Sequence, residues 1–193
     1  VLLSVVLAGG WVRSDVSAGE LIANLAKAID LVRGLDADGD APWWTPFYNG
    51  GSSMAPALGA LFTYAWLIAG TAVGGLLAGG KLVALLQIPL AGLAMFALVR
   101  RITRCGWTAA LAGLLYATTP QLSIALAVRE HMVVAFAFVW PPLVLLGLIR
   151  LRERGGWQDA AWCAAPMAAM GLTWIKSAVA LVPLVLLAVV WLW

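Results

Sequence analysis

Long, uninterrupted apolar runs constrain the fold of this chain more than any other feature of its sequence. Residues 107–128 and 178–193 contain no charged side chain at all. Water-soluble proteins carry about 25% charged residues, whereas this chain carries 11%. In hydrocarbon all backbone polar groups must be paired internally, so helix bundles and closed barrels are the options, and continuous rather than alternating runs favour helices. The sequence therefore predicts an all-α fold, a polytopic bundle of transmembrane helices.

The runs predict a partial first membrane helix and five further spans. The predicted segments are residues 1–12, 81–99, 107–128, 132–149, 158–175 and 178–193. The first run could instead be the core of a signal peptide, but Ala8, Gly9 and Gly10 followed by the bulky Trp11 form a poor cleavage site,. Because apolar runs lie at both ends of the chain, we interpret residues 1–193 as the N-terminal part of a longer membrane domain.

The longest polar segment runs from Arg13 to Pro56 and holds six of the nine acidic residues. Within it, Ser17 and Glu20 form a capping box, and the apolar residues that follow share one face of a helix,. We expect an amphipathic helix of about four turns lying at the membrane surface. Residues 13–80 are thus predicted to be the first extracytoplasmic loop, with interfacial helices.

Two other features of this loop have a structural and a functional interpretation. The aspartates of residues 35–40 resemble the start of a calcium loop, but the glycine is misplaced and the closing glutamate is missing, so a solvated turn is favoured and no metal site is predicted,. Trp43 and Trp44 suit the headgroup region as interfacial anchors,. Alternatively, their aromatic faces line a sugar-binding site.

Basic residues at helix ends predict the topology. Residues 100–104 and 150–154 form the two basic clusters, so both are expected in the cytoplasm,. The net charge of +3 therefore reports topology and does not indicate a nucleic-acid partner,. With the acidic loop outside, residues 57–69 are expected to dip into the outer leaflet, and the glycine-rich residues 70–80 bring the chain back. The alternative is that residues 57–78 span the membrane.

This topology brings four ionisable residues to the outer face. They are Asp15, Glu130, His131 and Lys176. Ionisable groups at membrane depth are costly and are functional candidates by default.

The two cysteines, Cys105 and Cys163, form no disulfide or metal motif,.

Several motifs occur in a familiar order: the acidic residue after the first helix, WWTPFYNGGSSMAP, the Arg-Arg pair that ends a helix, R-E-H in an outer loop, and GLTWIKSAVALVP. In this respect the chain resembles the GT-C superfamily of polytopic membrane glycosyltransferases. The closest likeness is to the mannosyl- and aminoarabinose-transferase-like branch, which uses dolichyl- or polyprenyl-phosphate sugars. The resemblance covers essentially the whole chain as the N-terminal half of such an enzyme.

The resemblance implies a role for each matched residue. Asp15 takes the place of the catalytic base, and Glu130 that of the second acidic position, with His131 beside it. Lys176 matches a lysine that binds the lipid phosphate, and Arg129 is a further candidate for stabilising that phosphate,. Val16 stands where many members have a second acidic residue, which puts a two-carboxylate or metal site in doubt.

The implied reaction moves a sugar from a polyprenyl-phosphate donor in the membrane to an extracytoplasmic glycan, lipid or protein acceptor. No cofactor is certain, and a divalent cation stays open. The implied location is the bacterial inner (plasma) membrane, with several membrane passes.

Each residue also has a purely structural interpretation. Asp15 can cap the following helix, Arg129 and Glu130 can pair with each other, and Lys176 can extend to the interface,. Two other functions stay open for the whole chain. One is a non-catalytic relative that binds carbohydrate or a partner protein, and the other is a lipid or solute transporter, which would need polar groups within the helices.

Overall fold

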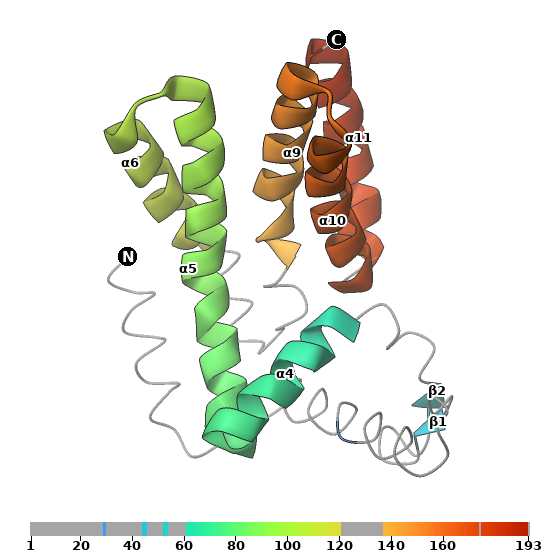
Figure 1. The fold of residues 1–193 in the computed structure, drawn as a ribbon. Helices are drawn as coiled ribbons and strands as arrows, with labels where there is room; N and C mark the ends of the chain where they lie inside the picture. Colours follow the sequence, from blue (N-terminus) through green and yellow to red (C-terminus); the bar gives the residue numbers. More distant parts are fainter. Residues whose placement is uncertain are drawn as a thin grey trace.

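The computed structural model describes residues 29, 44–45, 52–53, 61–120, 137–173 and 175–192. These residues are almost all helical (Figure 1), so the helical fold class is confirmed for this part of the chain. The exception is an antiparallel pair of two-residue strands, β1 (Trp44–Thr45) and β2 (Ser52–Ser53), in which Trp44 lies opposite Ser53. Of the predicted amphipathic helix, Ile29 is described, and it is helical.

Six helices contain most of the other described residues. They are α4 (Leu61–Gly74), α5 (Leu76–Thr103), α6 (Gly106–Ala117), α9 (Trp140–Arg154), α10 (Trp157–Thr173) and α11 (Ile175–Leu192). Among the described residues, one helical stretch, Ala78–Thr103, is long and apolar enough to cross a membrane. The 28 residues of α5 span about 42 Å at 1.5 Å per residue,. Shorter apolar stretches lie in α4, α6 and α11.

Residues 100–103 and 150–154 of the two basic clusters are helical, so the helices continue beyond the predicted spans, which end at residues 99 and 149. Arg100 and Arg101 lie in the last turn of α5, and Arg152 and Arg154 lie in the last turn of α9. Arginine is a good helix former, and a cation near a helix C-terminus is favoured by the helix dipole. The turns come later, where Arg104 (φ 55°) and Gly155 (φ 68°) adopt left-handed backbone conformations.

The chain turns back at the junction of α4 and α5, within the glycine-rich residues 70–80 (Figure 1). Helix α4 continues through Gly74 and α5 begins at Leu76, so these residues are the adjoining ends of two helices. The turn is confined to Gly75, whose φ of 77° suits glycine,. The backbones of α4 and α5 approach closely at Gly70 and Gly79. A Cβ atom on Gly79 would collide with the carbonyl group of Gly70. Small residues allow this close approach between helices.

Helix α6 ends at Ala117, eleven residues before the predicted end of its span. Pro120 explains the early end, because proline disfavours the helical conformation of the residue before it,. The Tyr116 hydroxyl donates a hydrogen bond of 2.9 Å to the carbonyl oxygen of Phe138. The end of α6 is thereby fixed to the segment that leads into α9.

Helices α9, α10 and α11 pack together, and α9 also packs against α5. Their core comprises Val144, Leu148, Cys163, Met170 and Leu181. Helices α9 and α10 cross closely at Gly147, where a Cβ atom would lie 2.7 Å from Cα of Cys163.

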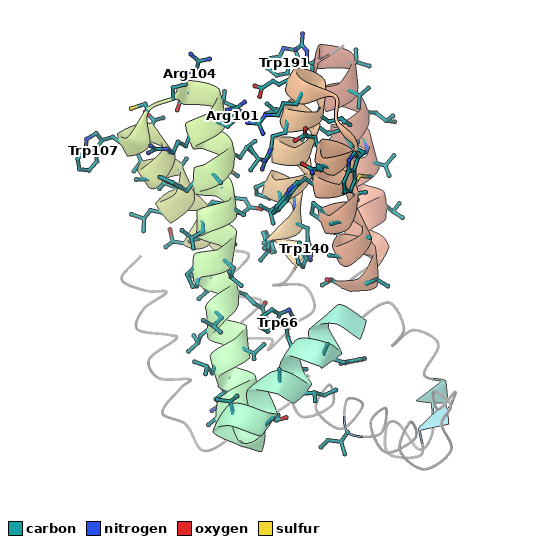
Figure 2. All side chains as sticks on the ribbon, viewed as in Figure 1. Trp66, Arg101, Arg104, Trp107, Trp140 and Trp191 are labelled. Carbon is teal, nitrogen blue, oxygen red and sulfur yellow. The ribbon has the colours of Figure 1, made fainter. Side chains whose placement is uncertain are left out.

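The helix directions gather the arginines at one end of the molecule. Helices α5 and α9 both run toward that end, where Arg101, Arg104 and Trp191 lie, whereas Trp66 and Trp140 lie nearer the other end (Figure 2). Helix α11 begins at the opposite end, and Lys176 is its second residue. The two basic clusters therefore share one end of the described helices.

Candidate functional site

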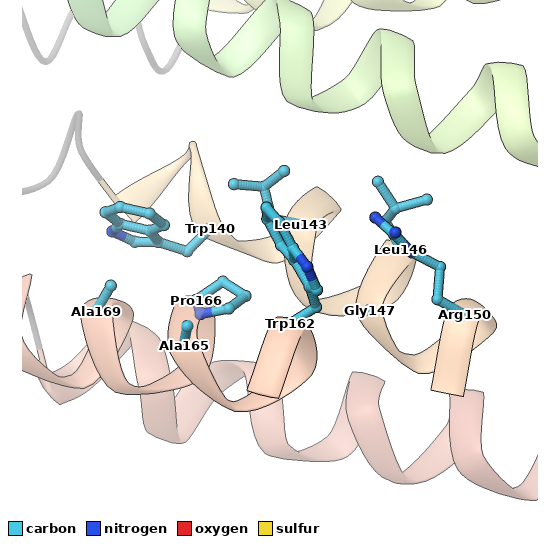
Figure 3. A pocket seen from close by; sticks show the side chains of 9 residues that line it. All are labelled: Trp140, Leu143, Leu146, Gly147, Arg150, Trp162, Ala165, Pro166 and Ala169. Atoms are coloured by element: carbon cyan, nitrogen blue, oxygen red, sulfur yellow. The ribbon is translucent and has the colours of Figure 1, made fainter. Parts of the chain in front are cut away.

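An apolar groove runs along α9 and α10 on the side that faces α5 (Figure 3). Its volume is about 390 Å³, within the range of roughly 300–1,000 Å³ that is typical of ligand pockets,. Nine residues line it: Trp140, Leu143, Leu146, Gly147, Arg150, Trp162, Ala165, Pro166 and Ala169. Apart from the guanidinium of Arg150 and the two indoles, the lining side chains are aliphatic.

Trp140 lies at one end of this groove. Its indole Nε1 donates a hydrogen bond of 3.0 Å to Oγ1 of Thr173, which in turn donates to the carbonyl oxygen of Ala169 at 2.7 Å. The first residue of α9 is thus tied to the last turn of α10. The side chains of Ala165 and Ala169 are too short to fill the space beside the ring, which leaves the groove open between the two tryptophans.

Arg150 lies at the other end of the groove, where two neighbouring side chains orient it. Its guanidinium carbon is 5.4 Å from the centroid of the Trp162 ring, which is a cation–π distance,. Its Nε is 3.7 Å from Oδ1 of Asp159, a mostly buried carboxylate in the first turn of α10. An acidic side chain is favoured in that turn by the helix dipole.

A second hollow, of about 470 Å³, adjoins the groove and shares Leu146 and Arg150 with it. It lies between α5 and α9 and is lined by Phe96, Ala97, Arg100, Arg101, Leu146, Arg150 and Arg154. We call it the arginine hollow. Arg101 forms an ion pair with Glu153. Within the described part of the chain, neither Arg100 nor Arg154 has a carboxylate partner, although Arg100 lies 5.8 Å from the ring centroid of Phe96.

Most residues of the predicted catalytic site lie outside the described residues. This applies to Asp15, Trp43, Arg129, Glu130 and His131. Trp44 belongs to β1, and Lys176 lies in the first turn of α11, at the end of the helices opposite the arginines. The convergence of these seven residues on one site therefore stays a prediction. In the ranges that the structure describes, no three histidine, cysteine or acidic side chains group as metal ligands.

Sequence reasoning missed the groove and the arginine hollow, because it interpreted the arginines as topology signals alone. One signal was present in the sequence. Arg150 and Arg154 are four residues apart on α9 and Leu146 precedes Arg150 by four, so all three share a helix face,. Without the partner helices, nothing indicated that α5 would bring Arg100 and Arg101 to the same face.

No protein-family model, no curated protein and no solved structure matches the chain.

Proposed function

We propose that this chain is part of a polytopic membrane glycosyltransferase of the GT-C type. In this proposal it moves a sugar from a polyprenyl-phosphate donor to an extracytoplasmic glycan, lipid or protein acceptor. The observation that carries the proposal is the gathering of arginines at one end of the helices. The arginines of α5 and α9 lie at one end and Lys176 at the other. Such a distribution is expected when one end faces the cytoplasm and the other the outer face.

The reaction assigns a role to each residue of the outer end. Asp15 accepts the proton of the acceptor hydroxyl as the bond to the sugar C1 forms. The glycosyl–phosphate bond breaks, and Lys176 and Arg129 stabilise the negative charge on the leaving polyprenyl phosphate. Glu130 orients the acceptor and His131 hydrogen-bonds to it, while Trp43 and Trp44 stack on a sugar.

The first test is the topology, because the mechanism needs its residues on one side of the membrane. Single cysteines at positions 15, 102, 130 and 176, in a background without Cys105 and Cys163, are labelled in intact cells with a membrane-impermeant maleimide. We expect labelling at 15, 130 and 176, and at 102 after permeabilisation alone. Labelling of 15 and 176 from opposite sides would exclude the proposed site.

The second test is chemical. The full protein in proteoliposomes is given a radiolabelled polyprenyl-phosphate mannose or aminoarabinose together with a cell-envelope extract as acceptor source. We expect Asp15→Asn to abolish transfer while donor binding persists, because the amide keeps the shape of the carboxylate and cannot accept the proton. Donor binding without transfer by the unmodified protein, under conditions in which a known glycosyltransferase is active, would favour the non-catalytic alternative.

A transport function is the second candidate, and one observation favours it. Gln87 is fully buried in α5, and neither atom of its side-chain amide has a hydrogen-bond partner among the described residues. Lys81, on the same helix, is also buried. Polar groups within membrane segments often mark solute pathways. Loss of solute uptake in Gln87→Leu proteoliposomes, with glycosyl transfer absent from the unmodified protein, would support transport.

A further inference from the structure

We propose that the α9–α10 groove and the arginine hollow together bind one anionic phospholipid. An acyl chain lies along the groove, and the phosphate lies between Arg100, Arg150 and Arg154. The inference rests on the membrane location in the proposed function and not on glycosyl transfer. It concerns the end of the molecule opposite Lys176 and so is separate from the proposed donor site.

The shape of the groove fits a lipid tail. Trp140 and Arg150 are ten residues apart on α9, which corresponds to about 15 Å along the helix axis,. The hydrocarbon core of a bilayer is about 30 Å thick, so the groove matches the depth of one leaflet. With Arg150 at headgroup level, the groove runs inward toward Trp140 and offers an almost wholly apolar surface to a chain.

The charge of the arginine hollow fits an anionic headgroup. Four arginines line it, and two carboxylates pair with them, Glu153 with Arg101 and Asp159 with Arg150. Among the described residues, no carboxylate pairs with the other two arginines, Arg100 and Arg154. Basic pockets between membrane helices on the cytoplasmic side are suited to phospholipid headgroups, and guanidinium groups bind phosphate oxygens in a bidentate manner.

The continuity of the two spaces argues for an amphiphile over a free anion or an apolar molecule. Leu146 and Arg150 line both, so the charged hollow adjoins the end of the apolar groove. The Trp162 ring beneath the guanidinium of Arg150 holds this side chain at the junction. A single ligand with a phosphate and a hydrocarbon chain fills both spaces, whereas inorganic phosphate occupies the hollow alone.

The test measures lipid binding to the purified full protein by native mass spectrometry. Dioleoylphosphatidylglycerol is titrated against dioleoylphosphatidylcholine, which has the same acyl chains and no net charge. We expect the anionic lipid to bind more tightly to the unmodified protein. The double variant Arg100→Gln/Arg154→Gln should lose about 25-fold in affinity for it, since each arginine near a lipid surface contributes a factor of about five.

Matched variants separate the site from general surface charge. Arg104→Gln/Arg152→Gln removes two charges from the same helix ends, but neither residue lines the hollow. This control should retain affinity within about threefold. An equal loss in both double variants would show that surface charge alone attracts the lipid, and it would overturn the proposal.

The groove has its own pair of variants. Ala169→Phe fills the groove without changing charge, and we expect at least a fivefold loss of affinity for the anionic lipid. Ala168→Phe places the same ring on the exposed side of α10 as a control. Ala165→Leu is a milder second change at the groove should Ala169→Phe not fold. Unchanged affinity in a folded groove variant would overturn the placement of the acyl chain.

Two further outcomes are decisive. Displacement of the lipid by 10 mM inorganic phosphate would identify the hollow as a site for a free anion and would overturn the lipid assignment. Failure of the protein to stay in membranes during carbonate extraction would remove the membrane premise and with it both proposals. Absence of glycosyl transfer would leave the lipid site intact, because no arm of this test measures transfer.

Discussion

Arg150 on α9 and Asp159 on α10 lie with Nε and Oδ1 3.7 Å apart, so the two helices are joined by an ion pair next to the groove. Asp159 is mostly buried, whereas Arg150 is about one-third exposed. Removing the arginine therefore leaves a nearly buried carboxylate without its cation. That asymmetry makes the pair suitable for a double-mutant cycle.

We expect Arg150→Met to lower the free energy of unfolding by about 1–3 kcal/mol, the usual cost of a buried polar group left without a partner. Asp159→Asn should cost less, because an amide is cheaper to bury than a charge. The double variant should recover part of the loss. SDS titration of the purified protein, monitored by circular dichroism, measures all three. Strictly additive losses would show that the two residues do not interact.

Gly147 is expected to tolerate no side chain. In Gly147→Val the Cβ atom meets Cα of Cys163 at 2.7 Å and the carbonyl oxygen of Trp162 at 3.0 Å, and both are backbone atoms that cannot rotate away. We predict a loss of about 1–3 kcal/mol from overpacking. Thermal unfolding in detergent measures it.

Gly171→Ala is the control for this prediction, because among the described residues no atom outside the local backbone of α10 lies within 4 Å of a Cβ atom built there. Gly171 lies within α10, where alanine is favoured over glycine by about 0.5–1 kcal/mol,. We expect a small stabilisation. A loss at Gly171 equal to that at Gly147 would contradict the explanation by close helix packing.

Cys105 is expected to be the more reactive of the two thiols. It is exposed between α5 and α6, and its pKa is lowered mainly by the hydrogen bond with the Thr108 side chain, with help from the amides of Thr108 and Trp107. Hydrogen bonds to the thiolate favour the charged form. Thr108→Val should therefore raise the pKa and move the midpoint of iodoacetamide alkylation to higher pH, whereas Thr108→Ser should leave it nearly unchanged. Cys163 is buried and should react after unfolding.

Gln87→Leu is expected to stabilise the protein by about 1–3 kcal/mol, because it removes a fully buried amide whose oxygen and nitrogen lack partners among the described residues,. Gln158→Leu, on an exposed position of α10, should change stability by less than about 0.5 kcal/mol,. Chemical unfolding of the two variants in the same detergent makes the comparison. A destabilised Gln87→Leu would show that the amide has a partner, such as a bound water or solute.

The helices of this chain could be predicted from the sequence better than their ends. In the described part of the chain the apolar runs coincide with helices, but α5 starts five residues before and ends four residues after the predicted span of 81–99. The predicted span was ended at glycine and charged residues, although Gly79, Arg100 and Arg101 are all helical. Hydropathy detects the apolar segment, whereas the helix ends where a left-handed residue such as Arg104 turns the backbone.

The predicted outer-face site could be proposed from the sequence, whereas the groove and the arginine hollow could not. The outer-face residues came from motif order and lie almost entirely outside the described residues, so that site stays a prediction. The groove and the arginine hollow depend on which helices are neighbours. Arg100 and Arg150 are fifty residues apart. Only the packing of α5 against α9 shows that they line one space.

The backbone contact between Gly70 and Gly79 has a consequence under the membrane location that we propose. The charge-free residues 82–99 of α5 span about 27 Å, close to the hydrocarbon core of about 30 Å, and a helix meets a change in membrane thickness by a change in tilt,. Because α4 is held to α5 at this contact, α5 cannot change its tilt without carrying α4 with it. In that case membrane thickness would set the depth of α4 as well as the tilt of α5.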